Sequence, residues 1–197
     1  TLTIILFLST YIISYDRILG KDFASRSEVI ATNGMAATSH PLATQTAIDV
    51  LKGGGNAIDA AIAANAVLGL VEPTGCGIGG DLFAIVWIDE DKKLYGLNSS
   101  GPAPQDMSIG KLKAMGIDKI PPYGPLPVTV PGAVAGWTAL HKRFGNKPFD
   151  ELFNNAIYYA DNGFPVTEVV GYYLQLSSER YKDYPNFADV WMPNGEA

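Results

Sequence analysis

Few side chains in this 197-residue chain have the types and spacing needed for chemistry. Gly75, Gly77 and Gly80 follow the G-x-G-x-x-G spacing of a dinucleotide-binding turn. Cys76 lies among these glycines, and with His40 as a base it could form a thiol–imidazole pair for nucleophilic catalysis. Both possibilities depend on the elements that would position these residues.

The order of elements around the glycines argues against a nucleotide site. In a dinucleotide-binding turn a strand runs into the glycines and a helix leaves them, so that the helix N-terminus faces the pyrophosphate. Here the Ala-rich stretch 56–70 comes first and predicts a helix, whereas 82–89 follows and predicts a strand. We therefore expect no nucleotide. The turn is either too tight for side chains or packed beside a site formed elsewhere.

The other candidates for catalysis or metal binding are also weak. A lone cysteine beside glycines is more often a small buried hydrophobe than a nucleophile. Asp81 and Asp89 lie at opposite ends of one predicted strand, too far apart to share a proton, and solvated or capping roles are expected. Neither Gly-x-Ser-x-Gly nor His-Glu-x-x-His occurs. Two histidines and one cysteine are too few soft ligands for a structural zinc site. The sequence predicts no catalytic residue, no metal site and no cofactor in this chain.

Composition is that of a globular protein with a core. The chain is 47% hydrophobic and 17% charged, which favours one domain. Its net charge of −6 comes without basic stripes, so nucleic acid is not an expected partner. A single cysteine excludes an internal disulfide.

The first 14 residues form an uncharged apolar run. This run is too short for a stable membrane span, which takes about 20 residues, but it has the length of a signal-peptide core, about 7–15 residues. We expect residues 1–14 to be a leader, interpreted as a signal peptide that lacks its first residues; a buried strand is the alternative. A signal peptide would make the protein periplasmic or secreted, and otherwise it would be cytoplasmic.

The remaining pattern predicts helices and a hairpin. A first helix is expected from Pro41 through Lys52, with Ser39 available as a cap, and Asn56 is expected to cap the second. The second helix is apolar on nearly all sides and should be buried. Strands at 82–89 and 94–98 should form a hairpin.

The rest of the chain predicts a Pro- and Gly-rich loop and three more helices. The loop is expected at 99–132, and the helices begin near Pro131, Phe149 and Val166. Because strands and helices do not alternate, the fold class expected is α+β.

Four segments resemble the front half of the gamma-glutamyltranspeptidase family, including its acylase-like and amidohydrolase-like relatives. They are 33-NGMAATSHPLAT-44, 53-GGGNAIDAAIAANAVLGLVEPTGCGIGGD-81, 125-PLPVTVPGAVAGW-137 and 161-DNGFPVT-167. The resemblance covers about residues 15–197, nearly all of the chain. In that family the helix–GxGGD–strand unit packs beside the substrate site and binds no nucleotide.

The resemblance implies a self-processing enzyme. Family members are N-terminal-nucleophile hydrolases with a four-layer αββα sandwich, made as one precursor that cleaves itself. The new N-terminal Thr of the second subunit is the nucleophile, and its own α-amine can act as the base. The chain is then expected to be an incomplete large subunit, inactive alone. Its partners would be a C-terminal small subunit and a small γ-glutamyl or other acyl amide substrate.

One loop departs from the family pattern. Transpeptidases carry an Arg-Glu-x-Ala-Pro segment whose Arg pairs with the α-carboxylate of the γ-glutamyl group, a task that suits the guanidinium fork. The matching segment 98–104 places Ser100 at the Arg position and Gly101 after it. Acylase-like relatives often have an Arg two positions later, where this chain has Pro102. Ser100 and Gly101 are predicted to border the substrate pocket without a positive charge.

The resemblance leaves two classes of function open. The leading one is amide hydrolysis or acyl transfer on a γ-glutamyl or related substrate. The alternative is a non-catalytic binding or scaffold domain that kept the fold without the second subunit. The coding sequence after Ala197 should discriminate them, because only the enzyme needs a Thr behind a cleavable junction.

Overall fold

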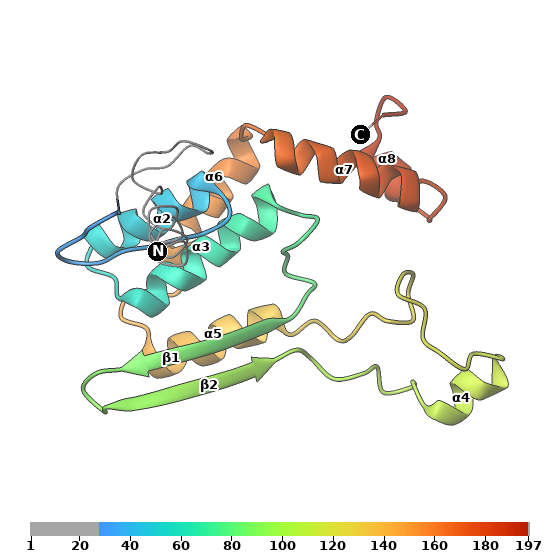
Figure 1. Cartoon of the computed structure of the whole chain (residues 1–197), viewed down its shortest axis with the longest axis horizontal. Coiled ribbons are helices and arrows are strands. Elements are labelled where there is room, and N and C mark those ends of the chain that lie inside the picture. Colours follow the sequence, from blue (N-terminus) through green and yellow to red (C-terminus); the bar gives the residue numbers. More distant parts are fainter. Residues whose placement is uncertain (1–27, 197) are drawn as a thin grey trace, which may run out of the picture. The chain divides into compact units, whose positions relative to one another are not determined.

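The structure of the chain is a computed structural model that describes residues 28–196 (Figure 1). The expected leader 1–14 lies outside these residues. The chain divides into a unit that ends at Met35 and a second unit that begins at Ala36. All helices and strands of the described residues lie in the second unit. None of the helices in residues 28–196 combines the length and the apolar character needed to cross a membrane.

The first two helices are α2 (Pro41–Lys52) and α3 (Ala57–Val71). Asn56 caps α3 as predicted: its side-chain oxygen accepts the N–H groups of Ile58 and Asp59, and the Asp59 carboxylate accepts the N–H of Asn56 in return. This reciprocal pair is a capping box. Only Ala57 and Ala61 of α3 are exposed, so the prediction of a buried second helix is confirmed.

The cap of α2 differs from the prediction. His40, not Ser39, is the N-cap residue, and its Nδ1 accepts the N–H of Leu42 at 3.2 Å. The Ser39 hydroxyl donates instead to a carboxylate oxygen of Glu72, just beyond the end of α3, at 2.6 Å. Sequence alone ranks serine above histidine as a cap, and this contact across 33 residues was not visible in it.

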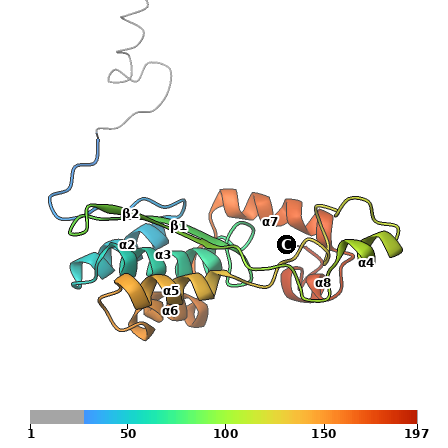
Figure 2. The same cartoon turned by 90° about the horizontal axis from the view of Figure 1, so that it is seen from below.

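The two strands form the predicted hairpin. Strand β1 (Leu82–Ile88) pairs antiparallel with β2 (Lys93–Ser99), and Ile85 lies opposite Gly96. The inner face of the hairpin packs against α3 and α5 (Ala133–Phe144). Its side chains there are Leu82, Ala84, Val86 and Leu97. Figure 2 shows the hairpin on one side, with α3 and then α5 beneath it.

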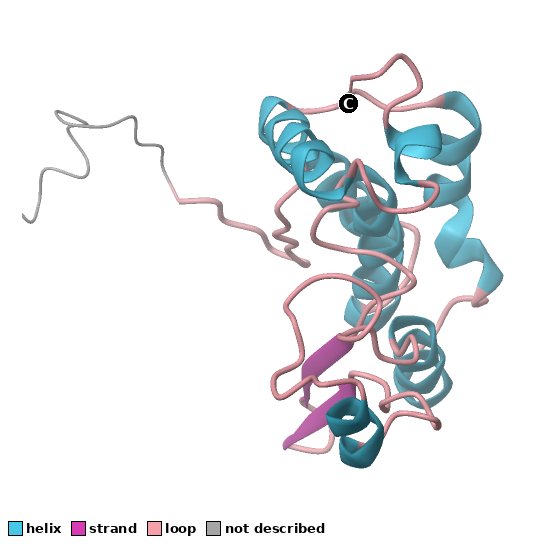
Figure 3. Cartoon of the chain, turned by 90° about the vertical axis from the view of Figure 1, so that its right-hand side faces the viewer, coloured by secondary structure: helices cyan, strands magenta, loops and turns pink. Residues whose placement is uncertain are grey.

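The remaining elements are α4 (Ile109–Ala114), η1 (Asp150–Phe153), α6 (Asn154–Asn162), α7 (Glu168–Tyr181) and α8 (Phe187–Trp191). The three remaining predicted helices occur in the predicted order with shifted boundaries, and two short helices, α4 and α8, were not predicted. The short helix α4 lies inside the stretch predicted as a loop. Helix α5 begins two residues after Pro131. The mixture of helices and one hairpin confirms the α+β class (Figure 3).

Asp59 joins the start of α3 to the segment that follows α5. Its carboxylate is fully buried, at 0% exposure, and accepts the backbone N–H groups of Asn146, at 3.0 Å, and Lys147, at 3.1 Å, as well as that of Asn56. Buried charge is tolerated when hydrogen bonds replace its hydration. This carboxylate therefore holds together two parts of the core that are far apart in the sequence.

Candidate functional site

Three segments meet at the end of the hairpin where β1 begins and β2 ends. They are the turn 74–81, the loop 98–104 and the stretch 125–133, called here the three-segment wall. The carbonyl oxygen of Gly80 accepts the N–H groups of Gly132 and Ala133, each at 3.0 Å. The Thr129 hydroxyl lies 3.2 Å from Oδ1 of Asp81 and 3.2 Å from the carbonyl oxygen of Ser100. Thr129 thus bridges the other two segments.

Two glycines fix the path of loop 98–104. Gly101 has a φ of +76°, and a Cβ built there would collide with the carbonyl oxygen of Val130. A Cβ on Gly132 would collide with the carbonyl oxygen of Ser99. The loop and the stretch 125–133 are further joined by Val130 N–H, which donates to the carbonyl oxygen of Pro102 at 3.0 Å. The backbone of this wall can approach so closely only because both positions lack a side chain.

The structure places both predicted site residues in this wall. Ser100 is partly buried, and its carbonyl oxygen accepts from Thr129. Its N–H donates to Oδ1 of Asn98 at 3.0 Å, so that donor is already used within the loop. Gly101 lies beside Val130 as described above. That Ser100 and Gly101 border a substrate pocket stays a prediction.

The glycine-rich turn has the predicted order of elements. Helix α3 ends at Val71 and β1 begins at Leu82, so a helix precedes the glycines and a strand follows them. A Cβ on Gly75, Gly77 or Gly79 would meet no atom within 4 Å, so the interpretation of a turn too tight for side chains is wrong at these three positions. The contacts of Gly80 and Asp81 agree with the other interpretation, a loop packed beside a wall formed elsewhere.

Cys76 and His40 do not form a catalytic pair. Nδ1 of His40 accepts from Leu42, and Nε2 is buried without a hydrogen-bond partner among the described residues. Burial, and then the charge of Glu72, raise the pKa of the Cys76 thiol, which opposes formation of the reactive thiolate. Residues 28–196 also contain no group of three His, Cys, Asp or Glu side chains placed to hold a metal ion.

The wall is poor in charge. Its three segments contain no Lys, Arg or His, and Asp81 is their single acidic residue. From the sequence, a solvated or capping role was expected for Asp81. Its contact with Thr129 links residues 48 positions apart, and no local pattern signals such a contact.

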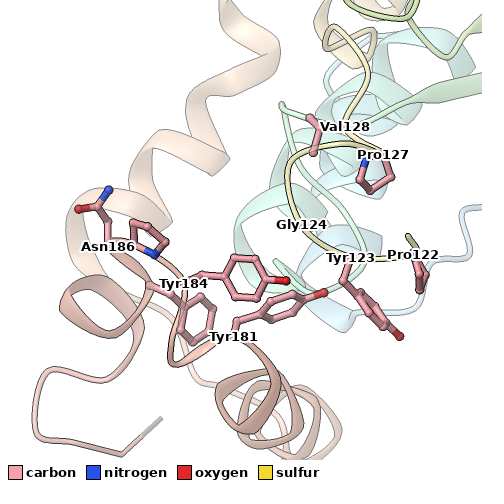
Figure 4. A pocket seen from close by; sticks show the side chains of 10 residues that line it. Pro122, Tyr123, Gly124, Pro127, Val128, Tyr181, Tyr184 and Asn186 are labelled. Carbon is pink, nitrogen blue, oxygen red and sulfur yellow. The ribbon is translucent and has the colours of Figure 1, made fainter. Parts of the chain in front are cut away.

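Two hollows adjoin the wall. Asp81 lines a cavity of about 350 Å³ between α3, β1 and α5, whose other polar side chain, Asn65, accepts from the Trp137 indole at 2.8 Å. A wider pocket of about 510 Å³ begins at Val128, directly before Thr129, and carries no charged lining residue. Figure 4 shows Tyr181 and Tyr184 facing the chain around Tyr123 in this pocket.

The family model and the curated relatives that match this chain point to the same family. The gamma-glutamyltranspeptidase family model matches residues 43–197. The glutathione hydrolase-like YwrD proenzyme of Bacillus subtilis is 35% identical over 170 residues, which are 86% of this chain and 32% of that protein. The oxamate amidohydrolase proenzyme of Klebsiella pneumoniae is 34% identical over 178 residues, 87% of this chain and 33% of that protein.

Solved structures of related enzymes also superimpose on this chain. Cephalosporin acylase from Bacillus halodurans superimposes with a TM-score of 0.82 at 46% identity, over 89% of this chain and 34% of the acylase. Gamma-glutamyltranspeptidase from Helicobacter pylori gives a TM-score of 0.75 at 32% identity, over 81% of this chain and 46% of that chain. The architecture is therefore part of an N-terminal-nucleophile hydrolase fold.

The chain spans about a third of the length of the curated relatives it matches. Within that span the sequence matches the family model, and the fold superimposes on that of two solved relatives. This chain belongs to the gamma-glutamyltranspeptidase family.

Proposed function

We propose that this chain is the front part of the large subunit of a self-processing amidohydrolase. The enzyme cleaves γ-glutamyl or related acyl amide bonds through a Thr nucleophile at the N-terminus of a second subunit. Relatives named as proenzymes, among them a glutathione hydrolase-like protein and an oxamate amidohydrolase, support this proposal. Because the nucleophile's own α-amine can act as its base, the enzyme needs no catalytic His or Cys from this chain.

The outer face of the hairpin is the observation that carries the proposal. Phe83, Ile85 and Trp87 are 67%, 81% and 55% exposed, and Leu94 lies opposite Trp87 on the same face. Adjacent large apolar side chains of this kind mark a surface that another element covers. In a four-layer αββα sandwich, a second sheet packs at this position, about 10 Å away. A partner sheet supplied by the rest of the precursor would bury this face.

In this proposal the chain shapes the substrate pocket and leaves bond cleavage to its partner. Loop 98–104, held by Gly101 and Gly132, forms a rigid part of the pocket wall. Rigid walls hold a substrate in a reactive orientation relative to the nucleophile. With Ser100 in place of a cation, the wall favours acyl groups other than a free γ-glutamyl group.

The test is expression of the complete coding sequence. The precursor should cleave itself into two chains, with Thr at the new N-terminus, and only the cleaved form should hydrolyse acyl p-nitroanilides. Replacing that Thr with Ala should abolish both cleavage and hydrolysis. A precursor that stays intact and hydrolyses no amide would instead support the non-catalytic scaffold.

A matched pair of substitutions tests the covered face. Ile85→Lys places a charge on the outer face of β1 and should prevent assembly with the second subunit, measured as loss of soluble, cleaved protein. Ile109→Lys is the control, since Ile109 is 75% exposed at the start of the short helix α4 and not on the hairpin. Equal effects of the two substitutions would contradict the proposed docking of a second sheet.

A further inference from the structure

We propose that Asp81 selects substrates whose acyl group carries a protonated amine and disfavours those with a free carboxylate. The inference rests on the proposed amide hydrolysis and names the substrate class for that same site. It makes Asp81 a specificity-determining residue, not a catalytic one. Four observations on the three-segment wall and its cavity support it.

The first is the charge of the wall. No Lys, Arg or His occurs in 74–81, 98–104 or 125–133, so a substrate carboxylate would find no counter-charge there. Asp81 is the single acidic residue of the three segments. Among groups of equal size, this wall attracts a cation and repels an anion.

The second is the use of hydrogen-bond donors within the wall. The Ser100 N–H is bonded to Asn98, and Pro102 has no N–H to offer. The N–H groups of Gly132 and Ala133, at the start of α5, both donate to Gly80. A helix N-terminus often binds anions, but these two donors are already occupied. These four positions therefore offer a carboxylate no free backbone N–H.

The third is the free capacity of Asp81. The side chain is exposed, and its one hydrogen bond within the described residues joins Oδ1 to Thr129 at 3.2 Å. The single hydroxyl proton of Thr129 is also within reach of the Ser100 carbonyl oxygen, so it serves Asp81 only in part. A carboxylate has about four acceptor sites. Most of those on Asp81 are available to a substrate.

The fourth is the cavity that Asp81 lines. Its volume of about 350 Å³ is within the range of small-molecule sites, and apolar side chains make up most of its lining. Trp137 contributes an aromatic ring, whereas the side chain of Phe83 lies on the outer face of the hairpin. Ring faces attract cations, and apolar walls suit an alkyl chain. An alkyl chain that ends in an ammonium group matches both the apolar lining and the carboxylate.

The experiment uses the complete, self-cleaved enzyme and three acyl p-nitroanilides of equal chain length, which end in an ammonium, a carboxylate or a methyl group. Wild type should prefer the ammonium substrate to the carboxylate substrate. Asp81→Asn should lower kcat/KM for the ammonium substrate about 10-fold, because a charge-assisted bond is about twice as strong as a neutral one. The carboxylate substrate should improve about 3-fold or more as the repulsion is removed, and the methyl substrate should change little.

Two further measurements distinguish an electrostatic effect of Asp81 from a structural effect of its substitution. The preference of wild type for the ammonium substrate should weaken as salt is raised, since the Debye length falls from about 10 Å at 0.1 M to about 3 Å at 1 M. Asp81→Glu keeps the charge and should keep the preference. Asp89→Asn, at the far end of β1 where Asp89 pairs with Lys92, is the matched control and should change no ratio.

The inference is overturned if Asp81→Asn leaves the ammonium-to-carboxylate ratio of kcat/KM unchanged or lowers all three substrates equally. If the enzyme hydrolyses none of the substrates, the proposed function has failed, and binding then tests the inference separately. Calorimetry with pentylamine and pentanoate should show tighter binding of the amine to wild type, and no such difference for Asp81→Asn. Equal binding of the two probes to wild type would refute the role of Asp81.

Discussion

Replacing Ser100 with Arg should increase activity toward γ-glutamyl substrates. The substitution introduces a guanidinium at the position where the family resemblance implies an Arg that pairs with the substrate α-carboxylate. A hydrogen bond to a charged group contributes about 1.5–3 kcal/mol. Loop 98–104 needs no rearrangement to accept the larger side chain, because Gly101 and Gly132 fix its backbone independently of the side chain at position 100.

The wall lowers the expected gain. Thr129 bridges Ser100 and Asp81, so a guanidinium introduced in place of the Ser100 hydroxyl would also be near the Asp81 carboxylate. An exposed ion pair with Asp81 would turn the guanidinium away from the substrate, and this competing orientation is stabilised by about 0.2–1 kcal/mol. The net gain in kcat/KM is therefore about 0.5–2.8 kcal/mol, or about 2- to 100-fold. Combining Ser100→Arg with Asp81→Asn removes the competitor and should increase the gain.

The assay compares kcat/KM for γ-glutamyl-p-nitroanilide and an uncharged acyl p-nitroanilide in the complete enzyme. Ser100→Gln is the control, since it adds length and hydrogen-bonding capacity without charge. The expected result is a gain for the γ-glutamyl substrate with Ser100→Arg alone and little change for the uncharged one. If wild type already hydrolyses glutathione efficiently and Ser100→Arg harms both substrates equally, loop 98–104 does not select for the carboxylate.

Three further predictions concern stability. Asp59→Asn should lower the free energy of unfolding of the complete protein in urea by about 2–4 kcal/mol, because an amide cannot accept all the buried N–H groups that the carboxylate satisfies. Asp106→Asn is the control and should have little effect, because Asp106 is exposed. Gly101→Ala should greatly reduce the soluble yield, because the new Cβ would collide with the carbonyl oxygen of Val130. Gly54→Ala is the control: Gly54 has a similar φ of +85° but no atom within 4 Å of the new Cβ, so the substitution should cost only about 1–2 kcal/mol of backbone strain. Equal yields of the two variants would refute the contact with Val130. The chain expressed alone should aggregate through the outer face of the hairpin, and a monodisperse, cooperatively melting product would favour a free-standing domain.

Local sequence patterns predicted the elements well. The run of glycines before Asn56, the apolar stretch after it and the β-branched residues of 82–89 each act within a few residues, so the helix, its cap and the hairpin could be predicted directly. The cap of α2 was misassigned because the Ser39 hydroxyl has a competing partner in Glu72, 33 residues away. Helix α4 was missed because it is only six residues long and lies among Pro and Gly.

The candidate site was predictable only in part. Ser100 and Gly101 were predicted from a motif and their role in a site stays a prediction, whereas the structure gives the physical reason for the glycine, a positive φ against Val130. The contact of Asp81 with Thr129 and those of Asp59 with Asn146 and Lys147 span 48, 87 and 88 residues. No local periodicity encodes such contacts. They depend on the way α3, the hairpin and α5 pack.

The glycines that fix loop 98–104 also bear on how enzymes with this fold could diversify. Gly101 and Gly132 determine the backbone path, while the side chain at Ser100 and the ring of Pro102 project from a path that is already set. In the proposed pocket, mutations at these two positions would alter the chemistry presented to a substrate without requiring a new loop conformation. A laboratory selection for new acyl specificity could therefore randomise 100 and 102 together with Asp81, and leave both glycines untouched. The library would be small, and most of its members should still fold.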